Sequence, residues 1–120
     1  MTEIQNSKQY DLEERTYQFT KSVGLFCKKL LKDVVNVEYI KQVVRSSASI
    51  GANYIEANEA LSKKDFSMRI KISRKEAKES CYWLRLIIDT NPLIQGEGQI
   101  LLREATELKK IFSSIVEKTK

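Results

Sequence analysis

Residues 66–88 have the sequence FSMRIKISRKEAKESCYWLRLII, and this stretch decides the fold. Apolar and small side chains recur in it at alternating spacings of four and three: Phe66, Ile70, Ser73, Ala77, Ser80, Leu84 and Ile87. This period is typical of a helix in the seam of a packed bundle. A second apolar stripe lies on a different face and consists of Met68, Ile72, Trp83 and Leu86. A four-helix monomer needs only the first stripe, so the second predicts a binding partner or a subunit interface.

Trp83 allows two interpretations. A tryptophan on an outer helical face is typical of an interface anchor, because its large ring is costly to expose. Alternatively, the fourth helix or the N-terminal arm of the same chain covers it. Glu79 lies within the same stripe, so an interface there has to pair this carboxylate or leave it at the rim.

The same period predicts three more helices, so the chain has four in all, joined by short connections. The first begins at Asp11, which can cap it, and residues 1–10 form a flexible N-terminal arm. The second runs over about 38–61 behind an Asn36 cap. The third follows the Ser-x-x-acid start at 62–65 and ends near Thr90, ahead of Pro92, and the fourth covers about 99–117. Residues 11–120 are therefore expected to form an all-α, antiparallel, up-down-up-down four-helix bundle.

In the first, second and fourth helices, one apolar stripe predicts the face that packs in the core. In the first helix the stripe is Leu12, Phe19, Val23, Phe26 and Leu30. In the second it is Ile40, Val43, Ser47, Ile50, Tyr54, Ala57 and Leu61, and in the fourth Leu101, Ala105, Leu108, Phe112 and Ile115. Gly24 interrupts the first helix, either to let a neighbour come close or as a neutral surface position, at a cost of about 1 kcal/mol relative to Ala.

The composition restricts the class of protein. A chain of 120 residues can bury a core without metal or disulfide help. With 42% hydrophobic residues, 31% charged residues and one proline, it favours helix over disorder. No run approaches the roughly 18 apolar residues of a membrane span, and the N-terminus has no secretory pattern. We therefore expect a cytoplasmic protein without a membrane partner.

Few residues offer catalytic chemistry. The chain has no histidine, which removes the usual general base near neutral pH and a common metal ligand. Cys27 and Cys81 fall inside helical patterns and are best explained as small buried hydrophobic residues. The segment at 96–98 lacks the strand and the lysine of a phosphate-binding loop, and no acidic spacing matches a calcium loop. We expect no catalytic residues, no metal and no cofactor, and hence not an enzyme.

Positive charge is concentrated in one window. The chain has a formal net charge of +5, and residues 63–85 hold eight basic and three acidic side chains, the same surplus. Lysines neutralise phosphates and a tyrosine can stack on a base, so this window predicts a nucleic-acid contact through Lys64, Lys71, Lys75, Lys78, Tyr82 and Arg85. The alternative is a solvated face that only keeps the protein soluble. Arg69 and Arg74 lie nearer the seam, where we expect them to pair with acids such as Glu56 or Glu76.

The outer face of the second helix is unusually rich in small and polar residues. Arg45, Ser49, Asn53 and Glu56 lie on it among serines and alanines, where a solvated face normally carries lysine and glutamate. Small residues let another backbone approach, and the polar side chains can then fix the register by hydrogen bonds. We interpret this face as a polar seam, within or between subunits. An ordinary polar surface is the alternative, and an active site is the least supported.

Several segments resemble one known family. They are YDLEERT at 10–16, RSSASIGANYIEA at 45–57, SKKDF at 62–66, ISRKEAKES at 72–80 and YWL at 82–84. In this order they resemble the bacterial four-helix bundle proteins related to the 23S ribosomal RNA intervening-sequence protein. Gly51 stands where that motif often has a proline, which predicts a locally straighter second helix.

The resemblance implies a ring-like homopentamer. It also implies kinship with the accessory variability protein of diversity-generating retroelements, which looks like a basic pentamer that binds nucleic acid and a reverse transcriptase. The first hypothesis is therefore a non-enzymatic pentamer that binds RNA or DNA through its basic surface as an accessory factor. The second is a protein–protein adaptor or scaffold whose basic face meets an acidic protein.

Overall fold

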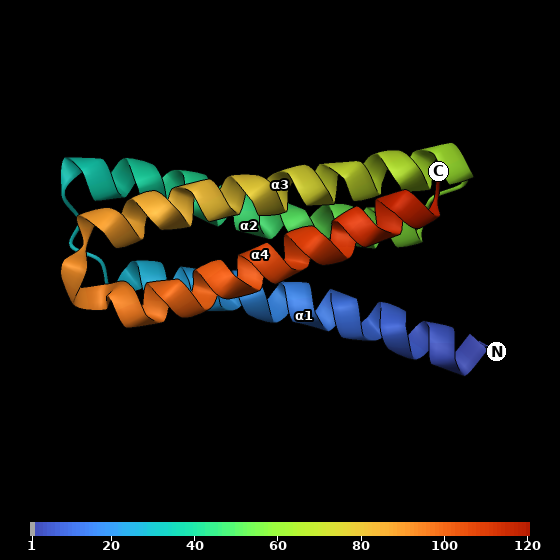
Figure 1. The fold of residues 1–120 in the computed structure, drawn as a ribbon, viewed down its shortest axis with the longest axis horizontal. Helices are drawn as coiled ribbons and strands as arrows, with labels where there is room; N and C mark the ends of the chain where they lie inside the picture. Colours follow the sequence, from blue (N-terminus) through green and yellow to red (C-terminus); the bar gives the residue numbers. More distant parts are fainter. Residues whose placement is uncertain (1) are drawn as a thin grey trace.

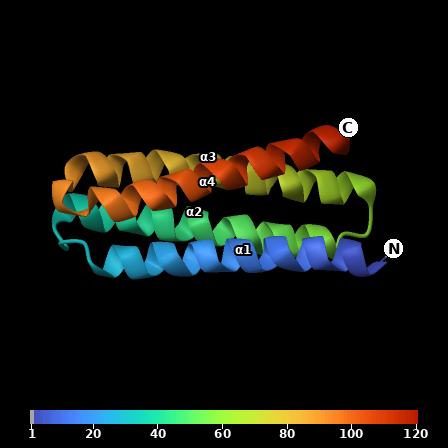
Figure 2. The ribbon, with the colours of Figure 1, turned by 60° about the horizontal axis from the view of Figure 1, so that its bottom comes forward.

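The computed structural model describes the backbone of residues 2–120 and the side chains of residues 11–120. This part of the chain forms four α-helices and one short 3-10 helix, with no strand (Figure 1). They are α1 (Thr2–Lys28), α2 (Val34–Asn58), α3 (Lys63–Thr90), η1 (Pro92–Ile94) and α4 (Gln95–Lys118). The connections between consecutive helices are short and lie at alternate ends of the molecule (Figures 1 and 2). The predicted all-α class with four helices is confirmed.

The boundaries of α3 agree with the prediction. Ser62 caps its first turn, because the Ser62 Oγ accepts a hydrogen bond from the Asp65 backbone N–H at 3.0 Å. The helix ends at Thr90, and Pro92 then opens η1. The residue before a proline disfavours helical torsions, which explains the stop at Asn91.

The predicted cap and end of the second helix are wrong. Asp33 caps α2 by accepting a hydrogen bond from the Asn36 N–H at 2.8 Å. Asn36 is instead buried in the first turn, and its side chain exchanges hydrogen bonds of 2.9 Å with Asn91. The helix ends at Asn58, so Leu61 lies in the connection and is fully exposed rather than part of the core.

Two other helices begin earlier than predicted. Helix α4 begins at Gln95, because η1 leads into it and leaves little of the expected loop. Helix α1 begins at Thr2, ahead of the expected start at Asp11. The predicted flexible arm covers residues 1–10; Met1 and the side chains of residues 2–10 lie outside the described part, and the flexibility stays a prediction.

The predicted core is confirmed apart from Leu61. The stripes of all four helices converge on one buried cluster, in which Leu12, Ile40, Phe66 and Ile115 are partly buried and the other apolar members are buried. In α4 the next residue, Val116, is buried as well. Tyr54 of α2 meets Phe112 of α4 edge to face, with ring centroids 5.6 Å apart, so the cluster spans the bundle.

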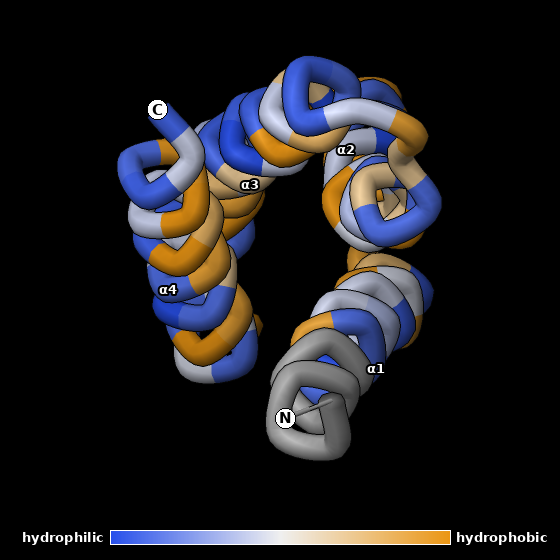
Figure 3. The backbone as a smooth tube through the Cα atoms, turned by 90° about the vertical axis from the view of Figure 1, so that its right-hand side faces the viewer, coloured by the Kyte–Doolittle hydropathy of each residue, from blue (hydrophilic) through white to orange (hydrophobic). Residues whose placement is uncertain are grey.

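Helix α3 is the best-packed element. It packs extensively against α2 and against α4, whereas α1 and α4 pack less against each other than the other neighbouring α-helices do. Viewed end-on, the helices follow an arc with α2 and α3 side by side and with α1 and α4 at its two ends (Figure 3). Both flanks of α3 are therefore covered by neighbouring helices, and its remaining face points outward.

Helices α1 and α2 approach each other closely at Gly51. A Cβ atom built on Gly51 would lie 2.8 Å from the Thr16 Oγ1 and 3.1 Å from the Thr16 Cβ. Thr16 is itself buried, and its hydroxyl donates to the carbonyls of Leu12 and Glu13 at 3.0 and 2.9 Å. Helix α2 runs through Gly51 without a break.

Gly24 has nothing within 4 Å of a built Cβ, which favours the neutral surface position.

These two glycines make a matched test of stability. Gly51→Ala should lower the free energy of unfolding, because overpacking against Thr16 costs about 1–3 kcal/mol while the gain in helix propensity is about 1 kcal/mol. Gly24→Ala should raise it by up to about 1 kcal/mol. Urea unfolding at one fixed protein concentration measures both changes. Equal stabilisation by the two substitutions would contradict the close approach of α1 and α2.

Candidate nucleic-acid interface

The predicted basic stripe lines a surface groove between α3 and α4. One part of the groove, about 590 Å³, is lined by Lys71, Arg74, Lys75, Lys78, Lys109 and Ser113. An adjoining part, about 620 Å³, is lined by Lys63, Lys64, Ser67, Met68, Lys71, Thr119 and Lys120. Lys71 belongs to both linings, so the two parts meet at this residue. We call these residues together the α3–α4 basic groove.

The charge of this groove has one sign. Its lining contains eight cationic side chains and no acidic one. Among the described residues, only Lys120 of these eight forms an ion pair, with Glu117 at 3.2 Å on the exposed surface. Unpaired cations that line a concavity produce a positive potential, and such a site attracts an anionic chain.

Tyr82 and Arg85, the other members of the predicted stripe, lie beyond the groove. Both are exposed, and neither lines it. Tyr82 follows Lys78 by four residues, so it lies on the same face of α3 one turn further along. Its ring meets that of Trp83 edge to face, with centroids 5.1 Å apart, while 57% of Tyr82 stays exposed.

Sequence reasoning missed part of this groove. Lys109 and Lys120 lie in the fourth helix and after it, and the periodicity of the third helix gives no sign of them. Arg74 lines the groove, contrary to the expectation that it pairs with an acid. The available signal is the spacing of Lys71, Lys75 and Lys78 by four and then three residues, which identifies a helical face but not the helix beside it.

A groove of about 1030 Å³ between α1 and α4 has a different character. It has an apolar floor that includes Phe19 and Leu101, and its rim mixes three cationic with two acidic side chains. Arg15 bridges it to Glu104 with two hydrogen bonds of 2.7 and 2.8 Å, and this pairing raises the pKa of the Arg15 guanidinium. Because its charges are mixed and paired, this groove offers no preference for a polyanion.

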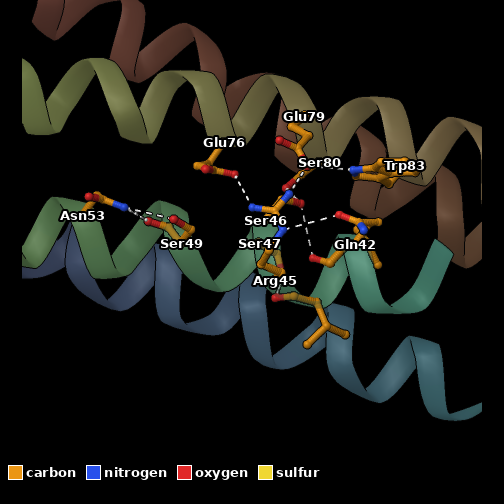
Figure 4. Close-up of polar contacts among 12 residues, drawn as sticks. Gln42, Arg45, Ser46, Ser47, Ser49, Asn53, Glu76, Glu79, Ser80 and Trp83 are labelled. Carbon is orange, nitrogen blue, oxygen red and sulfur yellow. Dashed lines mark hydrogen bonds and ion pairs between the residues drawn. The ribbon is translucent and has the colours of Figure 1, made fainter. Parts of the chain in front are cut away.

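The other flank of α3 forms a polar seam with α2 (Figure 4). The Arg45 guanidinium donates to Glu76 at 3.2 Å and also to Glu79. Ser46 and Ser80 share a buried hydrogen bond of 2.8 Å. Ser73 donates to the Ile50 carbonyl at 2.9 Å. Small residues let the two helices approach closely, and every buried hydroxyl of this seam then has a partner.

The seam continues toward the far end of α2. Asn53 donates to the carbonyl and the hydroxyl of Ser49 at 2.9 and 3.0 Å, and it accepts a hydrogen bond from Arg69 at 3.1 Å. Glu56 is exposed on the outer face. The structure thus brings Arg45, Ser49 and Asn53 into contacts within one chain, and a role for them between subunits stays a prediction. The partner of Arg69 is Asn53 rather than an acid, and that of Glu76 is Arg45.

The second apolar stripe of α3 lies beside this seam. Trp83 is half-buried: its ring packs 6.1 Å from Tyr39 of α2 between centroids, and its indole N–H donates to Glu79 at 2.9 Å. Helix α2 thus supplies a neighbour for Trp83, where the interpretation within one chain expects the fourth helix or the N-terminal arm; a role of Trp83 at a subunit interface stays a prediction. Ile72 and Leu86 are partly buried, and Met68 is 51% exposed.

Comparison with known proteins gives the family. The family model of the 23S rRNA-intervening sequence protein matches residues 8–114. The chain belongs to this family. A solved structure similar to it is that of a protein of unknown function from the S23 ribosomal protein family of Bacteroides thetaiotaomicron, with 32% identity and a TM-score of 0.82. That likeness covers 92% of this chain and 98% of the other. None of the curated proteins compared with it matches the chain.

Neither the intervening-sequence family match nor the structural neighbour names an enzymatic activity. The described residues contain no group of three or more His, Cys, Asp or Glu residues that could hold a metal ion. Burial raises the pKa of the Cys27 thiol to about 11, so this thiol stays protonated and unreactive near neutral pH. Among the residues that the structure describes, no helix is both long and apolar enough to cross a membrane.

The buried carboxylate of Glu76 makes the seam testable. Arg45→Ala should lower the free energy of unfolding by about 1–3 kcal/mol, because it leaves a carboxylate that is only 7% exposed without its charged donor. Adding Glu76→Gln to that variant should recover part of the loss. The control is Lys41→Ala, which removes an exposed ion pair with Glu38 and should change stability by less than about 0.5 kcal/mol.

Urea unfolding of the four proteins at one concentration measures these differences. Equal effects of Arg45→Ala and Lys41→Ala would show that the seam adds nothing to stability.

Proposed function

We propose that this family member is a non-enzymatic, homo-oligomeric bundle that binds nucleic acid, RNA in particular, through the α3–α4 basic groove. The observation that carries the proposal is the acid-free lining of that groove by eight cations from α3, α4 and the C-terminus. Phosphate contacts of this kind supply the sequence-independent part of nucleic-acid affinity. An accessory role in an RNA-related process in the cytoplasm is consistent with the family.

The proposal also includes the direction of the helices in the bundle and the number of subunits in the assembly. The bundle is antiparallel, up-down-up-down, as short connections at alternate ends favour. Five copies form a ring, as the resemblance to the pentameric relatives implies. The outer faces of α2 and α3 supply the subunit contacts, since Met68 is half-exposed and Ile72 and Leu86, on the same stripe, are only partly buried. Met68 also lines one end of the α3–α4 basic groove, and Lys75, Lys78 and Lys109 line its other end, between α3 and α4.

Salt dependence tests the binding. The logarithm of RNA affinity should fall linearly with the logarithm of salt concentration, with a slope near −0.7 per neutralised phosphate on a single strand. The triple variant Lys71→Ala, Lys75→Ala, Lys78→Ala should weaken binding and flatten the slope by about 2, because three phosphate contacts are lost. Fluorescence anisotropy with a labelled RNA over a salt series measures both quantities.

The matched control is Lys21→Ala, Lys28→Ala, Lys41→Ala, which removes the same charge from exposed positions on α1 and α2. It should keep the wild-type slope. Equal flattening by both triple variants would exclude the groove as the binding surface. Binding to polyglutamate without binding to RNA would favour the alternative, an adaptor for an acidic protein.

Light scattering tests the assembly. The wild-type chain of 13.9 kDa should scatter as five copies, about 70 kDa. Met68→Glu places a charge in the proposed contact face and should yield smaller particles, while circular dichroism shows unchanged helicity. The control Leu25→Glu alters a residue of α1 with the same exposure, 51%, and should keep the mass. A wild-type monomer at micromolar concentration would refute the proposed ring.

A further inference from the structure

We infer that the α3–α4 basic groove accepts a single strand rather than a duplex, and that a base leaving the groove stacks on Tyr82. This inference rests on the proposed function and specifies its ligand. It follows from the shape of the charged surface, from its length and from the aromatic residue beyond its end.

The cations line a concave surface. A helix that reads a duplex enters the major groove, which is about 12 Å wide, and presents its basic side chains on its own crest. Here the lysines of α3 face Lys109 of α4 and Lys120 across a groove between two packed helices. The axes of packed helices lie about 8–10 Å apart, so cations of α3 and of α4 can reach the same ligand. Cations on both sides of this open groove can contact one sugar–phosphate chain.

The length of the groove fits a short segment. Lys63 and Lys78 are fifteen residues apart on α3, which corresponds to about 22 Å along the helix. Grooves that track a single strand without sequence preference accommodate about 4–16 nucleotides and combine positive charge with aromatic side chains. Ser67, Ser113 and Thr119 add hydroxyl donors to the lining. The length of the groove therefore corresponds to a binding site near the lower end of that range of nucleotides.

Tyr82 supplies the aromatic surface. It lies seven residues after Lys75 and four after Lys78, so it continues the same face of α3 past the end of the groove. Its ring is held by Trp83 and is still 57% exposed. A ring that is fixed but open to solvent loses little conformational freedom when a base stacks on it. Arg85, also exposed, lies one turn further and can pair with the next phosphate.

Trp83 makes this contact observable. It is the only tryptophan of the chain, and its ring touches that of Tyr82. Its indole N–H is already held by Glu79, so its own environment is well defined. A base on Tyr82 should therefore change the fluorescence of Trp83 directly.

The experiment compares two probes on the wild-type protein. The first is a labelled RNA of about 12 nucleotides without self-complementarity, within the size range of such grooves. The second is the same RNA annealed to its complement. Anisotropy at one salt concentration should show about ten-fold tighter binding of the single strand, and only the single strand should alter Trp83 fluorescence.

Variants of Tyr82 give the second measurement. Tyr82→Ala should weaken single-strand binding about ten-fold and leave duplex binding unchanged, whereas Tyr82→Phe should stay within about two-fold of wild type because it keeps the ring. Circular dichroism and light scattering confirm that each variant keeps helicity and mass. The comparison of the two probes needs no variant, so it stands if Tyr82→Ala does not fold.

The outcomes separate the inference from the proposed function. Equal affinity for the two probes, or no effect of Tyr82→Ala, would overturn the inference while nucleic-acid binding stands. Binding to neither RNA at low salt would remove both. Binding of polyglutamate alone would assign the groove to an acidic protein segment.

Discussion

The packing of α3 between α2 and α4 is the constraint on which the other features of this protein depend. Its seam alternates large apolar residues such as Ile70 and Leu84 with small ones such as Ser73, Ala77 and Ser80. The small residues let α2 approach, and the buried hydroxyls are satisfied by partners on that helix. Helix α2 covers one flank of α3 and α4 covers the other. The partners of a charged side chain of α3 therefore depend on which of these two helices it lies nearer to.

This arrangement separates the two signs of charge across one helix. Glu76 and Glu79 lie on the α2 flank, where Arg45 pairs with both. Lys71, Lys75 and Lys78 lie toward α4, which adds Lys109 and no acid to the groove lining. The acids of the basic window are thus largely neutralised on one side, and its cations remain available on the other. A surplus of five charges spread evenly over the surface would favour solubility, whereas the same surplus in one groove favours an anionic ligand.

Local signals account for the success and the failure of the helix predictions. The limits of α3 are encoded by a serine cap and a proline, both of which act within a few residues, and the sequence predicts them correctly. By residue type, Asn36 and Asp33 are equally good caps; Asp33 takes that role, and Asn36 forms hydrogen bonds with Asn91 from a distant part of the chain. Leu61 fits the periodicity of the second helix, but α2 ends three residues earlier, so the period no longer places it in the core.

By itself, the sequence determined the number of helices, their core faces and the basic face of α3, because a period of three to four residues is a property of one helix. Only the tertiary structure decided which helix lies beside each of those faces. It placed Arg45 against Glu76, Gly51 against Thr16 and Lys109 opposite the lysines of α3. The physical reason is that a helical wheel gives the direction of a side chain from its own axis. The rotation of one helix against another is set by side-chain packing between segments far apart in the chain.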